Sequence, residues 1–434
     1  MNKKITKSLI LLIAIYISAA AFISLLTRPK TNSSVNTKIS EEQSLSIWYW
    51  DNSITSVFED FKNKYGYKNL KLDYTYIPNY EYSSSLSKAI SSGNPLPDIC
   101  ILHGNFLSAF VSYPIWEELD KEPYSLAPEM FPKELIPHIE NNKGELIAVP
   151  LDVPASGIAY RTSAMQKALG FSDPAKIMEY FPSWNDLIDK TYKIKNSSSP
   201  EIFLFASLDD PGFILFNQTD KPYINNSIFT ETEHIKESLN ILCRLKELKL
   251  IDDISSCSPK WYETFSDDKY LFTPWSSWLM QNGSFENNKA NDWCLISPPG
   301  GSYGYGYSVC VIPKKSDKKD LAFEFLRYWL MSDEGALSQL NKSGLIPAHM
   351  QTSDTINKSF KLDCFGDQNI GDIIFNDFIP NAKIYPTEEN TTAILNAFED
   401  TISAIKHTDQ MDVDAAFEYF KEKLSEAIPG LIFK

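Results

Sequence analysis

The chain is short of basic residues. Its 434 residues include 41 Lys and Arg against 56 Asp and Glu, which gives a formal net charge of −15 at pH 7. Proteins that bind nucleic acids need clustered Lys and Arg to neutralise phosphates. The charge balance therefore argues against a nucleic-acid partner.

Motifs for metal binding and catalysis are also missing. The six cysteines have no C-x-x-C spacing, and the five histidines form no H-E-x-x-H pattern, so neither a metal site nor another cofactor is expected. G-x-S-x-G and Walker A patterns are absent too, which leaves no motif for a nucleophilic or nucleotide-dependent enzyme. The sequence predicts no disulfide pair, because buried free cysteine is also common.

The N-terminus has the pattern of an exported protein. Three lysines within the first seven residues precede the uncharged, mostly apolar run Ser8–Leu26, and two basic residues follow it. Such a run indicates export with the N-terminus left in the cytoplasm, and its length is close to the ~20 residues that span a bilayer. We expect residues 1–30 to be a signal peptide or a membrane anchor, and residues 31–43 to be a polar linker.

A chain of this length is expected to form two domains. Hydrophobic periodicity predicts strands at Leu45–Trp50, Leu70–Ile77 and Asp98–Leu102, with an amphipathic helix between each pair. This β-α-β-α-β order is typical of a doubly wound α/β sheet, in which ligands bind at the carboxyl ends of the strands.

Two segments resemble connections between domains. Leu146–Pro150 predicts a short buried strand, and Pro150 and Pro154 hold the following residues extended before a second strand at Gly157–Tyr160. Ser308–Pro313 predicts a strand that returns to the first domain. These segments are interpreted as an interdomain hinge, although a buried strand with two proline turns would show the same pattern.

Several short motifs occur in the order and spacing of one family. Together, over about residues 44–430, they resemble bacterial ABC-transporter solute-binding proteins of the sugar-binding, maltodextrin-type branch, family 1. At one position the chain departs from the pattern, because Arg161 stands where the family carries Asn. The motif residues are Pro97–Ile99, Ala148–Pro150, Tyr160, Trp184–Leu187, Trp275 and Ser343–Ala348.

The resemblance implies an α/β fold of the two-lobed periplasmic-binding-protein type (type II-like), in which each lobe is a sheet flanked by helices and hinge crossovers join the lobes. The first lobe would comprise residues 44–152 and 311–352, and the second residues 153–310 and 353–434. The implied function is that of an exported monomeric receptor, not an enzyme. It would trap a carbohydrate between its lobes and present it to an ABC permease in the membrane.

Eight residues are the expected ligand contacts, some of which have a structural alternative. Trp275 matches the family's sugar-stacking tryptophan but could be a core residue, Asp51 could cap a helix, and His103 could be an ordinary loop residue. The candidates lie at strand ends, in the first connection and on two aromatic segments. They are Trp50, Asp51, His103, Asn105, Asp152, Trp275, Tyr303 and Tyr305.

Three alternative functions remain open at the level of sequence. The same fold could bind a peptide, a polyamine or a metal complex. A glycoside hydrolase could use two of the many carboxylates as acid and nucleophile. A domain held at the membrane by its N-terminal segment could act as a sensor.

Overall fold

The computed structural model describes residues 43–111, 113–197, 201–282, 285, 291–350, 360–384 and 390–433. The predicted signal or anchor segment, residues 1–30, lies outside them, as does nearly all of the linker. The chain divides into Met1–Gln43 and one compact unit, Ser44–Lys434. Within the described residues no helix combines the length and the apolar character needed to cross a bilayer.

The first sheet has five strands in the order β2-β1-β3-β11-β4. Strand β1 runs parallel to β3, whereas β11 is antiparallel to both of its neighbours, β3 and β4. The chain order β1-α2-β2-α3-β3 confirms the predicted β-α-β-α-β unit. The strands are β1 (Gln43–Tyr49), β2 (Leu70–Tyr76), β3 (Ile99–His103), β4 (Ala148–Pro150) and β11 (Ser308–Val311).

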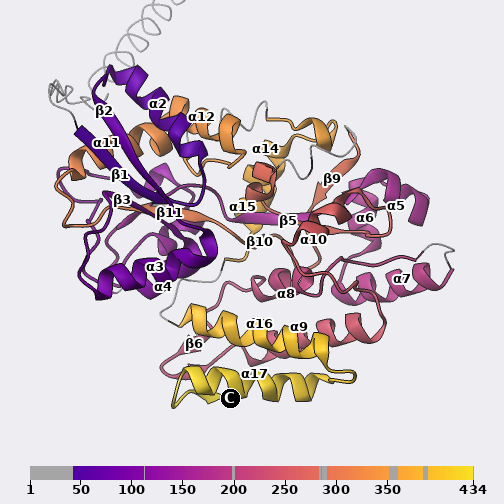
Figure 1. Cartoon of the computed structure of the whole chain (residues 1–434). Coiled ribbons are helices and arrows are strands. Elements are labelled where there is room, and N and C mark those ends of the chain that lie inside the picture. Colours follow the sequence, from indigo (N-terminus) through magenta and orange to yellow (C-terminus); the bar gives the residue numbers. More distant parts are fainter. Residues whose placement is uncertain are drawn as a thin grey trace, which may run out of the picture. The chain divides into compact units, whose positions relative to one another are not determined.

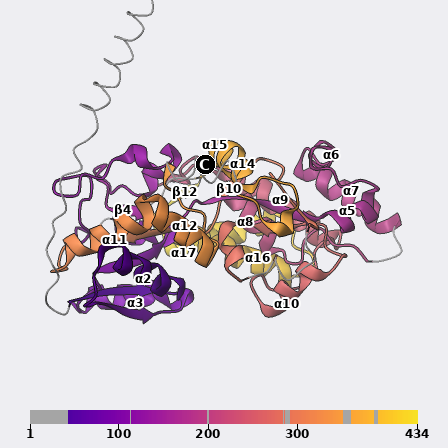
Figure 2. The same cartoon turned by 90° about the horizontal axis from the view of Figure 1, so that it is seen from above.

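Helices flank this sheet (Figures 1 and 2). They are α2 (Ser53–Tyr65), α3 (Asn79–Ser91), α4 (Gly104–Val111), α11 (Lys319–Met331) and α12 (Asp333–Ser343). The amphipathic face of α2 packs against α11 through edge-on aromatic contacts. The ring centroid of Phe325 lies 5.3 Å from that of Phe58 and 5.2 Å from that of Phe61. Burial of these large rings makes α2 part of the core.

The second sheet is built around β5, all seven residues of which are buried. Strands β8, β9 and β10 each pair with β5 in the antiparallel sense. The α/β class predicted for the chain is therefore confirmed. The strands are β5 (Ala155–Arg161), β8 (Thr273–Trp275), β9 (Trp293–Ile296) and β10 (Tyr303–Gly304).

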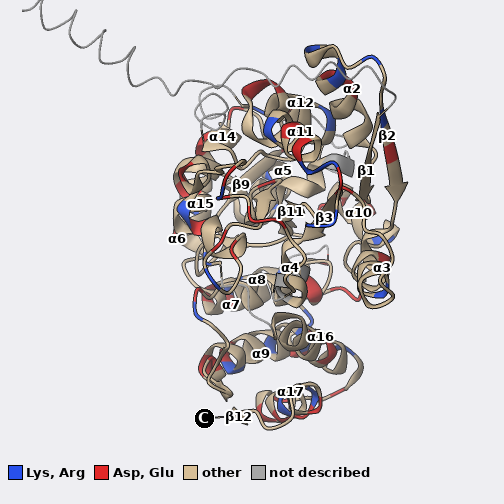
Figure 3. Ribbon diagram, turned by 90° about the vertical axis from the view of Figure 1, so that its left-hand side faces the viewer, with Lys and Arg blue, Asp and Glu red and all other residues tan. Residues whose placement is uncertain are grey.

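Helices also surround the second sheet. Figure 1 shows α9, α16 and α17 side by side at the bottom of the picture, below α8. Figure 3 shows acidic and basic residues interspersed along these three helices. The helices of this part are α5 (Thr162–Leu169), α6 (Pro174–Tyr180), α7 (Trp184–Ser197), α8 (Asp209–Phe216), α9 (Thr232–Glu247), α10 (Pro259–Glu263), α14 (Ile370–Asp372), α15 (Ile379–Asn381), α16 (Thr391–His407) and α17 (Val413–Ala427). A small sheet of β6 (Ile224–Asn225), β7 (Ile228–Phe229) and β12 (Ile432–Phe433) lies beyond them.

Two short segments connect the sheets. The first crossover, residues 151–154, leads from β4 to β5, and the second crossover, residues 305–307, leads from β10 to β11. The backbone N–H of Tyr305 donates to the carbonyl oxygen of Pro154 over 2.8 Å, so the crossovers are bonded to each other. The predicted hinge segment is buried and has a bend at Asp152, and its role as a hinge stays a prediction.

A buried carboxyl group strengthens this junction. One carboxyl oxygen of Asp152 accepts a hydrogen bond from the backbone N–H of Ser308 over 2.7 Å, and the N–H of Leu151 donates to the carbonyl oxygen of Ser308 over 2.8 Å. Asp152, one of the expected ligand contacts, is only 1% exposed. The bond to Ser308 draws the side chain inward, and burial raises the pKa of its carboxyl group well above the ordinary value.

The predicted lobe boundaries stay a prediction. Residues 44–434 form one compact unit, and no division inside it is established. Strand pairing favours a slightly earlier second boundary than residue 310, because β11 pairs with β3 from Ser308 onward.

Arg161 ends β5 inside a buried ion-pair network. Its guanidinium group donates to the carboxylate of Asp292 over 2.8 and 2.9 Å and pairs with Asp268 over 2.7 Å. The Asp292 carboxylate also accepts from the backbone N–H and the hydroxyl of Ser163, over 2.8 and 2.7 Å. Although burial acts to raise it, these bonds from Ser163 and Arg161 hold the pKa of Asp292 below the ordinary value. The network joins the start of α5 to β9.

We expect Asp152→Asn to stabilise the protein at pH 8. A folded-state pKa above the unfolded value means that the stability contributed by protonation is complete below the unfolded pKa and is lost as pH rises through the folded pKa. Each unit of that pKa difference corresponds to about 1.4 kcal/mol. Urea unfolding at pH 4, 6 and 8 should show an advantage for the variant that shrinks toward pH 4. An Asn variant that is less stable by the same amount at every pH would contradict this.

We expect Asp292→Ala to lower the free energy of unfolding by about 3–5 kcal/mol, because it leaves the buried Arg161 guanidinium without its main partner. The matched control is Asp268→Ala, which removes the outer partner, whose side chain is 44% exposed. That change should cost about 1 kcal/mol or less. Denaturant unfolding measures both variants. If they lose equal free energy of unfolding, the buried pair of Arg161 and Asp292 is not the main source of stability in this network.

Candidate functional site

Three partly exposed aromatic residues meet beside the second crossover, and we call them the aromatic cluster: Phe213, Trp278 and Tyr305. The rings of Phe213 and Tyr305 stack with centroids 5.2 Å apart and planes 23° apart. Trp278, in the 3₁₀ turn Ser277–Asn282, meets Tyr305 edge-on at 6.0 Å. Helix α8, the turn after β8 and the second crossover each supply one ring.

The segment that carries Trp278 is rich in buried polar atoms that have no hydrogen-bond partner among the described residues. They are the hydroxyl oxygens of Thr273 and Ser277 and the indole nitrogens of Trp275 and Trp278. A buried polar group without a partner costs about 1–3 kcal/mol. Folded proteins keep few such groups, and those they keep are often explained by a bound molecule or by function. This concentration within six residues marks the segment as a candidate ligand-binding wall.

Two buried serines fix the cluster to the second sheet. The hydroxyl groups of Ser156, in β5, and Ser276, after β8, hydrogen-bond to each other. One hydroxyl hydrogen is used in that bond, and the other hydroxyl donates to the carbonyl oxygen of Tyr305, which lies 3.3 Å from both hydroxyl oxygens. The backbone of Tyr305 is therefore held by β5 and by the residue that follows Trp275.

The first sheet also contacts the second crossover, at the end of β3. The backbone N–H of Gly104 donates to the carbonyl oxygen of Tyr307 over 2.9 Å, and the Tyr307 hydroxyl lies 3.0 Å from Nδ1 of His138. Only glycine fits at position 104, because a Cβ would overlap the Tyr307 ring. Burial lowers the pKa of both His103 and His138 to about 4, so both imidazoles are neutral at pH 7.

Asp51 and Trp50, at the end of β1, differ in role: Asp51 makes local structural bonds, whereas Trp50 stays available as a possible site residue. The Asp51 carboxylate accepts from the backbone N–H of Ser53 over 2.8 Å and from its hydroxyl over 2.9 Å, which is the helix-start role left open by the sequence. Trp50 is partly exposed, and its ring meets that of Tyr82 edge-on at 5.1 Å.

Trp275 and Tyr303 lie inside the protein, each 0% exposed. The Trp275 ring is enclosed by Phe365 and Phe378, with centroids 6.3 and 6.5 Å away, and the Tyr303 hydroxyl donates to the carbonyl oxygen of Gly157 over 3.2 Å. These contacts agree with the alternative of core packing for Trp275. Direct ligand contact by Trp275, Tyr303 or Asp152 stays a prediction.

Of the eight predicted residues, the structure brings His103, Asp152 and Tyr305 to the crossovers. The backbone of Asn105 lies in α4, and its side chain falls outside the described residues. Sequence reasoning missed Phe213 and did not single out Trp278. One feature of the sequence could have identified Trp278 as a site residue: it lies three residues after Trp275, in the same segment.

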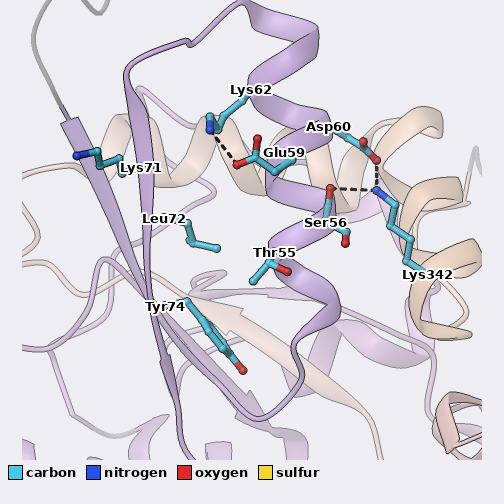
Figure 4. Close-up of a pocket in the computed structure, with 9 residues that line it drawn as sticks. All are labelled: Thr55, Ser56, Glu59, Asp60, Lys62, Lys71, Leu72, Tyr74 and Lys342. Carbon is cyan, nitrogen blue, oxygen red and sulfur yellow. Dashed lines mark hydrogen bonds and ion pairs between the residues drawn. The ribbon is translucent and has the colours of Figure 1, made fainter.

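A pronounced hollow lies elsewhere (Figure 4). Its volume is about 640 Å³, and α2, β2 and Lys342 of α12 line it. Its charged groups are largely paired, since Lys62 bonds Glu59 over 2.8 Å and Lys342 bonds Asp60. None of the eight predicted residues lines it. Within the described part of the chain, no group of three or more His, Cys, Asp or Glu residues could hold a metal ion.

Known structures share this fold at low sequence identity. A crystal structure of an extracellular solute-binding protein of family 1 superposes with a TM-score of 0.76 at 17% identity, covering 88% of this chain and 99% of that one. The ABC transporter associated binding protein from B. animalis subsp. lactis Bl-04, in complex with β-1,6-galactobiose, gives 0.72 at 18% identity, covering 91% and 100%. The GacH receptor of Streptomyces glaucescens gives 0.70 at 16%, covering 89% and 98%. These likenesses confirm the predicted two-lobed periplasmic-binding-protein fold.

Comparison of sequences identifies the family. No curated protein matches the chain significantly. Residues 56–361, however, match the model of the bacterial extracellular solute-binding protein family. A match over this length shows that the chain belongs to the bacterial extracellular solute-binding protein family and is therefore an exported solute-binding protein.

Proposed function

We propose that the protein is the receptor of an ABC importer and binds a sugar or an oligosaccharide at the aromatic cluster. The observation that carries this proposal is the combination of partly exposed rings with unpartnered polar atoms beside the crossovers. Aromatic rings offer a flat apolar face to the C–H face of a pyranose. The unpartnered N–H and O–H groups of the neighbouring segment suit the hydroxyl groups of the same molecule.

The known structures support a carbohydrate as the ligand class. The B. animalis protein was crystallised with β-1,6-galactobiose and GacH with acarbose, both of which are carbohydrates. They differ from one another, so the fold supports the ligand class and leaves the individual sugar to be measured.

The imidazole groups near the crossovers offer no positive charge to an anionic solute. His103 and His138 are both neutral at pH 7. A polyamine or another strongly charged ligand would need opposite charges that face it.

A hydrolytic function has less support, because it needs two available carboxyl groups. Asp210, whose pKa burial raises to about 7, is the carboxyl group near Tyr305 with the pKa expected of a general acid. It is 1% exposed, and it accepts from the indole N–H of Trp261 over 3.1 Å and from the hydroxyl of Ser256. These bonds explain Asp210 as a structural link between α8 and α10, and we propose that the protein is not an enzyme.

In this proposal the crossovers act as the hinge. Ligand binding would shift the population toward a closed form, which the permease recognises. Such a receptor would contact its permease only transiently, through a small interface. We propose that it acts as a monomer.

We expect a neutral glycan to stabilise the protein. A thermal-shift panel should contain maltotriose, β-1,6-galactobiose and lacto-N-biose, together with spermidine and a tripeptide. A glycan at a hundredfold excess over its Kd adds about 2.7 kcal/mol of stability. Chromatography after overnight incubation should show the glycan intact. Stabilisation by spermidine or the tripeptide alone would contradict a sugar ligand, and cleavage of the glycan would contradict a receptor.

Trp278 and Trp275 should respond oppositely to truncation. We expect Trp278→Ala to weaken glycan binding by roughly 1–3 kcal/mol, the range for an important contact, with a small change in apo stability. Trp275→Ala should instead cost roughly 3–5 kcal/mol of folding stability, because it empties a core position. Calorimetric affinity and apo melting temperature measure both. The reverse pattern would return Trp275 to the site and remove Trp278 from it.

The N-terminal segment, Ser8–Leu26, is proposed to keep the exported protein on the outer face of the membrane. Its length and its basic flanks support this proposal. We expect the native protein in the membrane fraction with its N-terminus intact. A soluble product whose first residue lies between about 22 and 32 would show a cleaved signal peptide instead.

A further inference from the structure

The second crossover is anchored to a different sheet on each side of Gly306. Before it, Tyr305 is bound to the second sheet. Its backbone N–H donates over 2.8 Å to Pro154, the residue before β5, and its carbonyl oxygen accepts over 3.3 Å from the hydrogen-bonded pair of Ser156 and Ser276. Figure 1 shows this crossover running from β10 to β11 at the middle of the unit.

After Gly306, Tyr307 is bound to the first sheet. Its carbonyl oxygen accepts from the backbone N–H of Gly104 over 2.9 Å, and its hydroxyl lies 3.0 Å from Nδ1 of His138. One residue therefore separates a tyrosine fixed to one sheet from a tyrosine fixed to the other. Any rotation of the sheets must change the backbone angles at or beside Gly306.

Gly306 has the backbone conformation that such a pivot needs. Its φ is +70°, a left-handed value that glycine adopts without strain and other residues adopt rarely. It also lies directly against Trp278, because a Cβ at this position would be 2.5 Å from the indole nitrogen. Gly306 is thus in contact with Trp278, the partly exposed tryptophan of the aromatic cluster.

The indole N–H of Trp278 is covered at this contact and has no acceptor among the described residues. An indole nitrogen can only donate, so the group can be satisfied only by an acceptor oxygen or nitrogen that is not present in this conformation. Leaving it unpaired raises the free energy of this conformation relative to one in which it is bonded.

We propose that Gly306 is the pivot of the second crossover and that its rotation uncovers the Trp278 N–H, which then donates to a hydroxyl or ring oxygen of the solute. The inference rests on the proposed function for the identity of the solute. It adds a specific donor, and it couples that donor to the motion between the sheets. Bound solute would hold the crossover in the rotated position by pairing a donor that is otherwise unsatisfied.

Hydrogen exchange of the indole N–H groups in the full-length chain tests the pivot without any ligand. Trp278→Phe and Trp275→Phe assign the two ¹⁵N-indole signals. Gly306→Ala introduces a Cβ that cannot fit against the indole, so exchange at Trp278 should quicken at least tenfold. The matched control is Gly304→Ala, whose Cβ would lie 3.0 Å from Cγ1 of Ile384, a tight contact but not an overlap, at a position without a left-handed φ. It should change exchange at Trp278 by less than twofold.

Exchange at Trp275, which is fully buried, is the internal reference. It should be unchanged in Gly306→Ala if the variant rotates only the crossover. Unchanged exchange at Trp278 in Gly306→Ala would overturn the pivot. Equal acceleration at Trp275 and Trp278 would also overturn it, because that result indicates general loosening.

Binding of maltotriose, or of the panel glycan that the parent chain binds best, tests the donor. Trp278→Phe keeps an aromatic ring but removes the N–H. We expect about a tenfold loss of affinity with an apo melting temperature equal to or above that of the parent. Unchanged affinity would overturn the donor role. If the parent binds no glycan, the proposed function fails, and the exchange measurement still decides whether Gly306 controls Trp278.

Discussion

The connection between the two sheets depends on the hydrogen bond from the Ser308 backbone to the buried carboxyl group of Asp152. Ser308 begins β11, and Asp152 lies two residues beyond β4, so the bond ties both crossovers together where they enter the first sheet. The carboxyl group has lost its water, and burial raises its pKa. Such a group is retained at a free-energy cost. It satisfies a backbone donor at a point where the regular ladder between β4 and β11 ends, and this supplies a physical reason for its presence.

Under the proposed function, the fixed crossovers determine which aromatic rings can meet a solute. Tyr305 is held by β5 and by the residue after Trp275, so its ring stacks on Phe213 of α8 and meets the edge of Trp278. The polar atoms on the adjoining segment, in contrast, lack partners within the described protein. A fixed framework thus lies beside unsatisfied polar groups, one of which, the Trp278 N–H, is covered in this conformation.

Much of the fold could be predicted from local patterns. The alternation of strands and helices up to β3 follows from hydrophobic periodicity. The irregular connection between Pro150 and Pro154 follows from proline geometry. Both act over a few residues. The meaning of Arg161 could not be predicted. It departs from the family pattern, and its partner Asp292 lies 131 residues away. Arg161 serves the junction of β5 and β9, so the departure is explained by folding and carries no information about the solute.

The same limit explains why the sequence favoured Trp275 over Trp278. The two residues are three positions apart in one segment, and both have the composition of a ligand platform. Their exposure is decided by distant residues: Phe365 and Phe378 enclose Trp275, whereas Trp278 lies against Gly306 at the chain's return to the first sheet. A family motif specifies that an aromatic residue belongs in this segment, but packing selects which ring is left partly exposed. In this protein it is the tryptophan that touches the one residue separating Tyr305 from Tyr307, so under our proposal recognition and hinge motion share a contact.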